Sequence, residues 1–147
     1  MKKKILITYA KYGSGHESIA KYICDYLIIH NKSYEVMLLD MTPYANISGK
    51  FGINIMKFVG KYRPEKIFDF CYNISDNKLT SSISKKYALR SFDNTKLRNT
   101  IKSFDPDITI SSHFYCSNII AEYNKLGLIF SKIVTIITDY HSHETWT

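Results

Sequence analysis

The sequence predicts an α/β fold in which a mostly parallel, doubly wound sheet is covered by helices on both faces. Two observations lead to this expectation. Short apolar runs alternate along the chain with segments of helical periodicity, and the connections between the runs are long enough for parallel crossovers. The 147 residues, of which 45% are hydrophobic and 22% charged, suffice for one domain with a single core.

The expected strands are short, nearly continuous apolar runs, a pattern typical of strands buried on both faces. We expect strands at residues 5–9, 34–39, 107–111 and 133–138. The first strand ends directly at a glycine-rich turn, and each of the others is followed by polar residues. Because such sheets bind ligands beyond the carboxyl ends of their strands, the residues that follow the strands are candidate site residues.

The expected helices follow from apolar spacing. Residues 17–30 form a helix in this interpretation, because Ile19, Ile23 and Leu27 recur every four residues. The same reasoning predicts helices at residues 95–104 and 117–126. Gly127 is a common type of helix stop, so it supports the end of the last of these helices.

Residues 42–94 are longer than a usual crossover and mix apolar with basic side chains. One interpretation is a pair of short core helices with solvated basic faces. The other is an insertion that faces a membrane, in which Phe58 enters the lipid while Lys57, Lys61, Arg63 and Lys66 contact anionic headgroups. The sequence leaves both interpretations open.

The charge and the absence of long apolar segments indicate where the protein acts. Twenty Lys and Arg against thirteen Asp and Glu give a net charge of +7, which suits a polyanion, a phosphorylated ligand or an anionic membrane. Lys11 ends the first apolar stretch too early for a signal peptide, and no run approaches the roughly 18 residues of a membrane span. Three cysteines without metal or disulfide spacing suit a reducing compartment. We expect a cytoplasmic protein that associates peripherally with the cell membrane.

The glycine-rich turn after the first strand is a candidate anion site. The backbone amides of Gly13, Ser14 and Gly15 lie at the N-terminus of the expected helix, where negative groups are stabilised. No Gly-Lys-Ser/Thr follows, which excludes a P-loop, and Ser18 occupies the place of the third glycine of the dinucleotide fingerprint. Asp40 lies near the spacing of a ribose-binding acid. A Rossmann-type nucleotide-binding module without catalytic activity is therefore retained as an alternative.

Histidines follow the third and fourth expected strands. His113 faces the candidate cleft if the sheet rule holds, although a structural hydrogen bond is an equally reasonable role. His141, His143 and Glu144 are spaced like metal ligands, but alternate residues of an extended segment supply only two well-directed ligands. We therefore expect no metal site.

Three blocks of residues, spread over the chain, match the motifs of one family. Residues 7–16 read Ile-Thr-Tyr-Ala-Lys-Tyr-Gly-Ser-Gly-His, and residues 106–113 read Pro-Asp-Ile-Thr-Ile-Ser-Ser-His. Residues 138–146 read Thr-Asp-Tyr-His-Ser-His-Glu-Thr-Trp and fit a Thr-Asp-aromatic-x-x-His-x-x-Trp pattern. Together the blocks resemble the N-terminal domain of the diacylglycerol glycosyltransferases of the monogalactosyldiacylglycerol synthase type. A plain dinucleotide binder has no reason to contain the third block.

The resemblance implies the acceptor-side, Rossmann-like domain of a GT-B glycosyltransferase over residues 1–147. It also implies an inverting enzyme of glycolipid synthesis that moves a hexose from a UDP-sugar to diacylglycerol. Because the sequence stops just after its fourth expected strand, we expect a truncated chain that lacks the donor-binding domain and is inactive alone. The expected partners are diacylglycerol and an anionic membrane surface, with no nucleic acid and no cofactor beyond the UDP-sugar substrate.

The resemblance also assigns roles to individual residues. Inverting transfer needs a base for the proton of the acceptor hydroxyl, and His16 is the candidate because a helix N-terminus favours neutral imidazole. Helix capping or phosphate binding is the alternative role of His16. Asp139 either orients a catalytic group or makes an ordinary turn hydrogen bond. The candidate acceptor- or phosphate-binding residues are Gly13, Ser14, Gly15, His113, His143 and Trp146.

Overall fold

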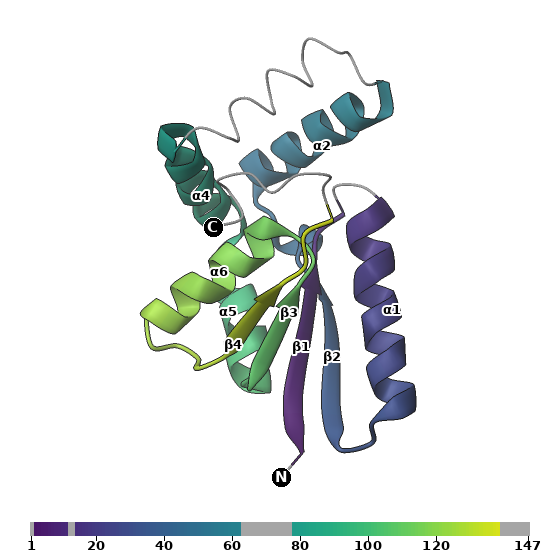
Figure 1. Ribbon diagram of the computed structural model, residues 1–147. Coiled ribbons are helices and arrows are strands. Elements are labelled where there is room, and N and C mark those ends of the chain that lie inside the picture. Colours follow the sequence, from purple (N-terminus) through teal and green to yellow (C-terminus); the bar gives the residue numbers. More distant parts are fainter. Residues whose placement is uncertain (1, 12–13, 63–77, 139–147) are drawn as a thin grey trace.

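The computed structural model describes residues 2–11, 14–62 and 78–138, in which four strands alternate with helices (Figure 1). In chain order the elements are β1 (Lys3–Tyr9), α1 (Ser14–His30), β2 (Tyr34–Asp40), the 3₁₀ turn η1 (Thr42–Tyr44), α2 (Ile47–Tyr62), α4 (Lys78–Phe92), α5 (Thr95–Phe104), β3 (Ile108–Ser111), α6 (Phe114–Lys125) and β4 (Lys132–Thr135). The α/β class expected from the sequence is confirmed.

The four strands form one all-parallel sheet with the order β2-β1-β3-β4. Ile5 in β1 pairs with Val36 of β2 on one side and with Ile108 of β3 on the other. The chain therefore leaves β1 in one direction to form β2 and later returns to the opposite side of β1 to form β3. This reversal is the mark of a doubly wound, Rossmann-like sheet and confirms the predicted architecture.

The central strand β1 is buried on both faces because its side chains alternate between two cores. Ile5 and Ile7 pack with Ala20 and Cys24 of α1. Leu6 belongs to a second, larger cluster that includes residues of α5 and α6. Figure 1 shows α1 on one side of the sheet and α5 with α6 on the other. The continuous apolar run of the sequence thus reflects burial on two sides.

Two predicted strand boundaries are wrong by two or more residues, for reasons of pairing. β1 begins at Lys3, two residues before the apolar run, because the Lys3 backbone pairs with Tyr34. β4 ends at Thr135 and does not continue to residue 138. Its neighbour β3 ends at Ser111, whose carbonyl accepts the last bond of the ladder from the Ile136 amide at 2.8 Å. A short neighbour therefore shortens the strand.

The helix ends show which local signals the apolar spacing misses. α1 begins at Ser14, three residues before the predicted start, and α6 begins at Phe114 instead of residue 117. α6 starts there because the ring of His113 accepts a hydrogen bond from the Tyr115 amide. The positive φ of Gly127, at 65°, confirms it as the stop after α6. The predicted bounds of α5 are confirmed, with Asn94 as its cap.

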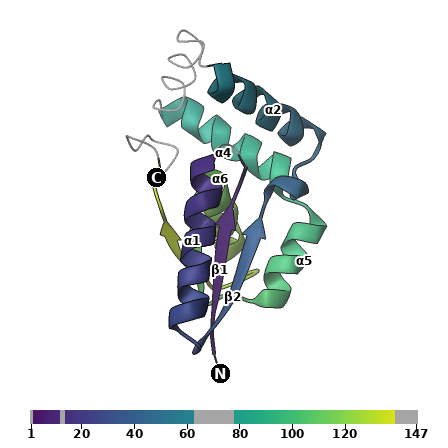
Figure 2. The same cartoon turned by 90° about the vertical axis from the view of Figure 1, so that its right-hand side faces the viewer.

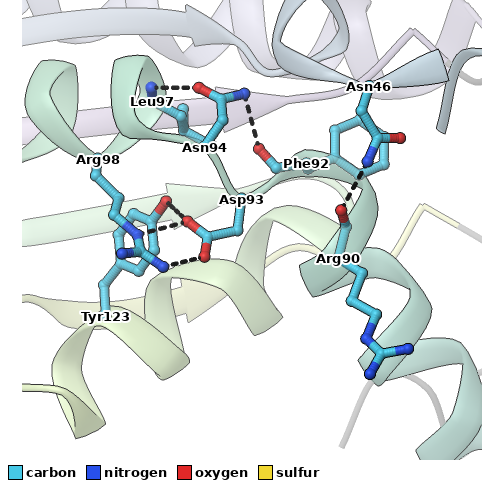
Figure 3. Close-up of polar contacts among 8 residues, drawn as sticks. All are labelled: Asn46, Arg90, Phe92, Asp93, Asn94, Leu97, Arg98 and Tyr123. Carbon is cyan, nitrogen blue, oxygen red and sulfur yellow. Dashed lines mark hydrogen bonds and ion pairs between the residues drawn. The ribbon is translucent and has the colours of Figure 1, made fainter. Parts of the chain in front are cut away.

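Among its described residues, the long connection between β2 and β3 includes helices α2 and α4, which lie beyond the carboxyl end of β1 (Figures 1 and 2). The helices approach closely at Gly49, where an added Cβ would lie 3.0 Å from the Cβ of Ser91. Two asparagines link the segment just before α2 to the end of α4 and the turn that follows it. Asn46 donates to the Arg90 carbonyl at 2.8 Å (Figure 3). Asn94 donates to the Tyr44 carbonyl at 2.6 Å. The start of α2 and the end of α4 are thus held next to each other.

An ion pair close to these two asparagines joins the turn after α4 to α5, and a tyrosine of α6 hydrogen-bonds to it. The carboxylate of Asp93 accepts from the Arg98 Nε at 2.8 Å and from the Tyr123 hydroxyl at 2.7 Å, and the Arg98 Nη2 reaches its second oxygen (Figure 3). Hydrogen bonds from Arg98, despite the opposing effect of burial, lower the pKa of Asp93. The three side chains therefore hold the turn between α4 and α5 against α6, which covers the sheet.

Two features bear on the expected location of the protein. No helix within the described ranges has the length and apolar character needed to cross a membrane. Cys24 and Cys116 are free and buried, and burial raises the pKa of both thiols. Cys71 lies outside the described residues.

Candidate functional site

The candidate site lies where the strand order reverses, between the carboxyl ends of β1 and β3. His16 is in the first turn of α1, which follows β1, and Ser112 and His113 directly follow β3. The Ser112 amide donates to the Thr8 carbonyl at 3.0 Å, so this segment stays against β1 beyond the end of β3. In doubly wound sheets this switch point is the usual ligand site. The fold therefore brings together two histidines that lie 97 positions apart in the sequence.

Hydrogen bonds fix the protonation pattern of the His16 ring. Its Nδ1 lies 2.5 Å from the carbonyl oxygen of Ser112 and 2.9 Å from Oγ1 of Thr138. Because a carbonyl only accepts, Nδ1 must carry the proton and donate it. Neutral imidazole then has its lone pair at Nε2. The Ser112 hydroxyl also donates to the His16 carbonyl at 2.8 Å, so the two segments are joined twice.

The ring of His113 lies edge-on to His16, with 4.5 Å between ring centroids. His113 is 3% exposed, and its Nδ1 accepts from the Tyr115 amide at 3.2 Å. Neutral His113 therefore carries its proton at Nε2, the reverse of His16. Helix capping is thus one role of His113, and its assignment to acceptor or phosphate binding stays a prediction.

The described part of the glycine-rich turn, Ser14 and Gly15, forms the start of α1 directly before His16. Ser14 is the first residue of the helix, and a Cβ added to Gly15 would meet nothing within 4 Å. Packing against the described residues therefore does not require a glycine at residue 15, and none of those residues fills the space beside it. An open helix start is compatible with the predicted anion site.

Several predicted site residues lie outside the described part of the chain. They are Gly13, Arg63, Lys66, Asp139, His143 and Trp146. Their roles stay predictions. Residues 2–11, 14–62 and 78–138 contain no group of three His, Cys, Asp or Glu side chains that could hold a metal ion.

Asp40, which the alternative interpretation assigned to ribose binding, has protein partners for both of its carboxylate oxygens. Oδ1 accepts from the Thr42 amide at 2.8 Å, and Oδ2 lies 3.4 Å from the ammonium of Lys11. A hydrogen bond to Asp40 and the charges of Asp40 and Glu17 raise the pKa of Lys11. Asp40 therefore orders the segment after β2 and neutralises a lysine after β1.

The exposed side of α2 carries an unusual row of apolar side chains, which we call the α2 stripe. Its members recur every three or four residues, and they are Ile47, Phe51, Ile55, Phe58 and Tyr62. Phe51 is 67% exposed and Phe58 is 58% exposed. The buried residues Gly49 and Ile53 occupy the opposite side of the helix. The exposed stripe and the buried side of α2 are therefore both largely apolar.

Basic residues border the α2 stripe. Lys57 and Lys61 are exposed, and the Lys61 ammonium lies 5.2 Å from the ring centroid of Tyr62. The predicted membrane-binding residues Lys57, Phe58 and Lys61 thus share the solvent-facing part of α2. Both sequence interpretations of this region remain predictions, but the apolar exposure is greater than the first interpretation expects.

Sequence reasoning missed the contact partners that orient His16. The sequence marks Thr138 only as part of a motif and as the end of an expected strand. The carbonyl of Ser112 has no sequence signature at all. The one available signal is position. Ser112 follows one expected strand and Thr138 ends another, and they directly precede the polar residues His113 and Asp139. The hydrogen bonds themselves depend on tertiary structure.

Comparison with known proteins agrees with this architecture and with the motifs around the site. No curated protein and no solved structure matches the chain. A family model described as monogalactosyldiacylglycerol (MGDG) synthase matches residues 16–147, which include His16, Ser112, His113 and Thr138. Because the match covers most of the sequence, the chain belongs to the MGDG synthase family, a family of glycolipid glycosyltransferases.

Proposed function

We propose that this chain is the acceptor-side domain of an inverting enzyme that transfers a hexose from a UDP-sugar to diacylglycerol. The observation that carries the proposal is the state of His16, whose Nδ1 donates to the Ser112 carbonyl at 2.5 Å and whose Nε2 is therefore the basic nitrogen. Its position at the sheet switch point supports a role in ligand chemistry. The family membership supports glycosyl transfer as that chemistry.

In the proposed reaction, the acceptor hydroxyl oxygen attacks the anomeric carbon from the face opposite the nucleotide. The new C–O bond forms as the bond to the UDP oxygen breaks, and UDP leaves with the electron pair. The hydroxyl proton passes to Nε2 of His16. The Ser112 carbonyl and the Thr138 hydroxyl, both near Nδ1, stabilise the imidazolium that results. Asp139, which follows Thr138, is proposed to polarise the acceptor.

The donor is proposed to bind mainly to a second domain, as the family resemblance implies. Gly13, Ser14 and Gly15 would then offer backbone donors to a phosphate group or to the acceptor. His113, His143 and Trp146 would line the acceptor entrance. The space at Gly15, which no described side chain fills, supports this part of the proposal, because a ligand could approach the helix start there.

The transfer reaction is tested by His16→Ala in a polypeptide that joins this chain to a donor-binding domain. We expect turnover of UDP-hexose with diacylglycerol in mixed micelles to fall at least ~100-fold, since a general base contributes about 10²–10⁴. His30→Ala is the matched control, because His30 is exposed at the far end of α1. Normal turnover with His16→Ala would exclude His16 as the base.

We also propose that α2 docks on an anionic bilayer, which brings the site to its lipid acceptor. The α2 stripe supplies apolar contacts, while Lys57 and Lys61, with Arg63 and Lys66, contribute roughly 1 kcal/mol each near anionic headgroups. An aromatic side chain can bury about 200 Å². Since about 60% of Phe51 and Phe58 is exposed, full coverage in lipid is worth about 3 kcal/mol for each ring.

Sedimentation with phosphatidylglycerol vesicles tests the docking. Phe51→Ser combined with Phe58→Ser should lower the partition coefficient at least ~10-fold. This corresponds to about 1.4 kcal/mol, roughly half of the free energy expected from covering one ring. The control pair Tyr22→Ser and Phe130→Ser removes two aromatic rings elsewhere that are at least as exposed, and it should change the partition coefficient less than about twofold. Exchange of Lys57, Lys61, Arg63 and Lys66 for Gln should abolish most binding. Equal loss in the control pair would contradict docking through α2.

A further inference from the structure

A hollow beside the candidate site has a lining that none of the roles above explains. It has a volume of about 390 Å³ and lies between α2 and the segments that follow β1 and β2. Its lining residues are Lys11, Asp40, Thr42, Pro43, Lys50, Ile53, Asn54 and Lys57. Small-molecule sites commonly occupy about 300–1,000 Å³, so the hollow has room for a small ligand.

Helical spacing places one row of hydrogen-bond donors along this hollow. Lys50, Asn54 and Lys57 follow one another at intervals of four and three residues, so they share one side of α2. That side adjoins the α2 stripe. A ligand in the hollow would therefore lie at the border between the polar site and the surface proposed to meet lipid.

The charges in the hollow are unbalanced. Three lysines face a single carboxylate, Asp40, which is already bound by the Thr42 amide and by Lys11. Within the described part of the chain, no carboxylate lies within 4.0 Å of the ammonium group of Lys50 or Lys57. Two positive charges therefore remain without a partner of opposite charge among these residues.

The remaining polar groups of the lining also offer donors. The Oγ1 of Thr42 accepts from the Lys11 amide at 2.8 Å, so the Thr42 hydroxyl proton is available to an incoming acceptor. The Asn54 amide adds a neutral donor. A lining in which two ammonium groups have no carboxylate partner among the described residues, and in which neutral groups add further donors, fits a tetrahedral anion with several acceptor oxygens, because lysine binds phosphate as a point charge.

We propose that this hollow binds the phosphate group of a small phosphate ester, with Lys50 and Lys57 as its main charged contacts. Pro43 and Ile53 provide an apolar wall for the ester substituent. The ester is either the headgroup of an anionic phospholipid in the bilayer or a soluble metabolite. The proposal does not need sugar transfer, and its calorimetric test in solution does not need docking through α2, so its failure can be distinguished from failure of the proposed function.

Calorimetric titration of the 147-residue chain with glycerol 3-phosphate, at constant ionic strength, tests the site. We expect saturable binding that weakens at least ~10-fold in the double variant Lys50→Gln, Lys57→Gln, because two charge-assisted contacts are lost. The control Lys102→Gln, Lys132→Gln makes the same change of net charge at exposed lysines of α5 and β4, and should stay within about twofold of the original. Circular dichroism checks that both variants fold.

A second arm identifies the source of the phosphate. The chain is bound to phosphatidylglycerol vesicles, and glycerol 3-phosphate is added against a chloride control of equal ionic strength. Release beyond the chloride control supports a lipid headgroup as the occupant, whereas saturable binding without release supports a soluble ester. Absence of saturable binding, or equal weakening in both double variants, would overturn the proposal.

Discussion

Replacement of Asp93 by alanine tests whether the corner beside the α2–α4 insertion is held by the charge cluster in Figure 3. Asp93→Ala removes the acceptor of the Tyr123 hydroxyl and of the Arg98 guanidinium. Tyr123 is completely buried, so its hydroxyl would be left without this partner. A buried donor that loses its acceptor costs about 1–3 kcal/mol.

The Arg98 contribution is smaller because that side chain is 44% exposed and water screens the pair. The loss of the Tyr123 partner therefore sets most of the cost of Asp93→Ala, about 1–3 kcal/mol, which lowers the melting temperature of a domain of this size by about 2–12 °C. Tyr123→Phe leaves the Arg98 pair intact and should cost only about 1 kcal/mol.

Urea denaturation followed by circular dichroism at pH 7 measures these differences. Asp25→Ala, which removes an exposed acid of α1, is the matched control and should change the free energy of unfolding by less than about 0.5 kcal/mol. If Asp93→Ala costs no more than Asp25→Ala or Tyr123→Phe, the cluster does not hold the corner.

The pH dependence provides a second check with a defined sign. The Arg98 hydrogen bond lowers the pKa of Asp93 below its ordinary value of 3.8 in the folded protein. A lowered carboxyl pKa stabilises the folded state above that ordinary value, and the contribution disappears as pH falls through the folded pKa. The stability difference between the original chain and Asp93→Ala should therefore be full at pH 5–7 and should shrink below about pH 4. A difference that grows on acidification would contradict the reasoning.

Three further predictions concern the site and its surroundings. Side-chain nitrogen NMR should show neutral His16 protonated at Nδ1, because the Ser112 carbonyl can only accept; a dominant Nε2–H form would contradict this assignment. Asn46→Ala should cost about 1–2 kcal/mol, since it removes an acceptor for the Gly49 amide and a donor to Arg90, and hydrogen exchange should accelerate in α2 more than in β1. Calorimetry should give a dissociation constant for UDP no tighter than about 1 mM, whereas micromolar affinity would favour a nucleotide-binding module.

The sequence by itself determined the fold class because local patterns report burial and chain reversal. The apolar run of β1 predicts a strand covered on both faces, and Ile5, Leu6 and Ile7 are all buried. The bounds of α5 followed from its apolar spacing, and the structure adds the Asn94 cap that starts the helix. Three motif blocks indicated the family that the comparison then supported. Each of these inferences uses residues that are close together in the chain.

Only the tertiary structure decided which side of α2 packs against the protein. Apolar residues occur on both sides of this helix, so periodicity could not distinguish the buried Ile53 from the exposed Phe51 and Phe58. The packing side is selected by Gly49, which permits close approach to Ser91. The end of β4 was likewise set by its neighbour, because a strand needs a partner for each backbone bond and β3 ends at Ser111.

The chemistry of the candidate site also depended on contacts between distant segments. The sequence selected His16 as a polar residue after a strand, but the Ser112 carbonyl that fixes its proton lies 96 positions away. Backbone carbonyls are present at every residue, so no sequence pattern marks the one that will accept. The strand order β2-β1-β3-β4 places the residues after β1 beside those after β3. That order, and with it the nitrogen of His16 that is available for a proton, is set by sheet pairing and not by local sequence.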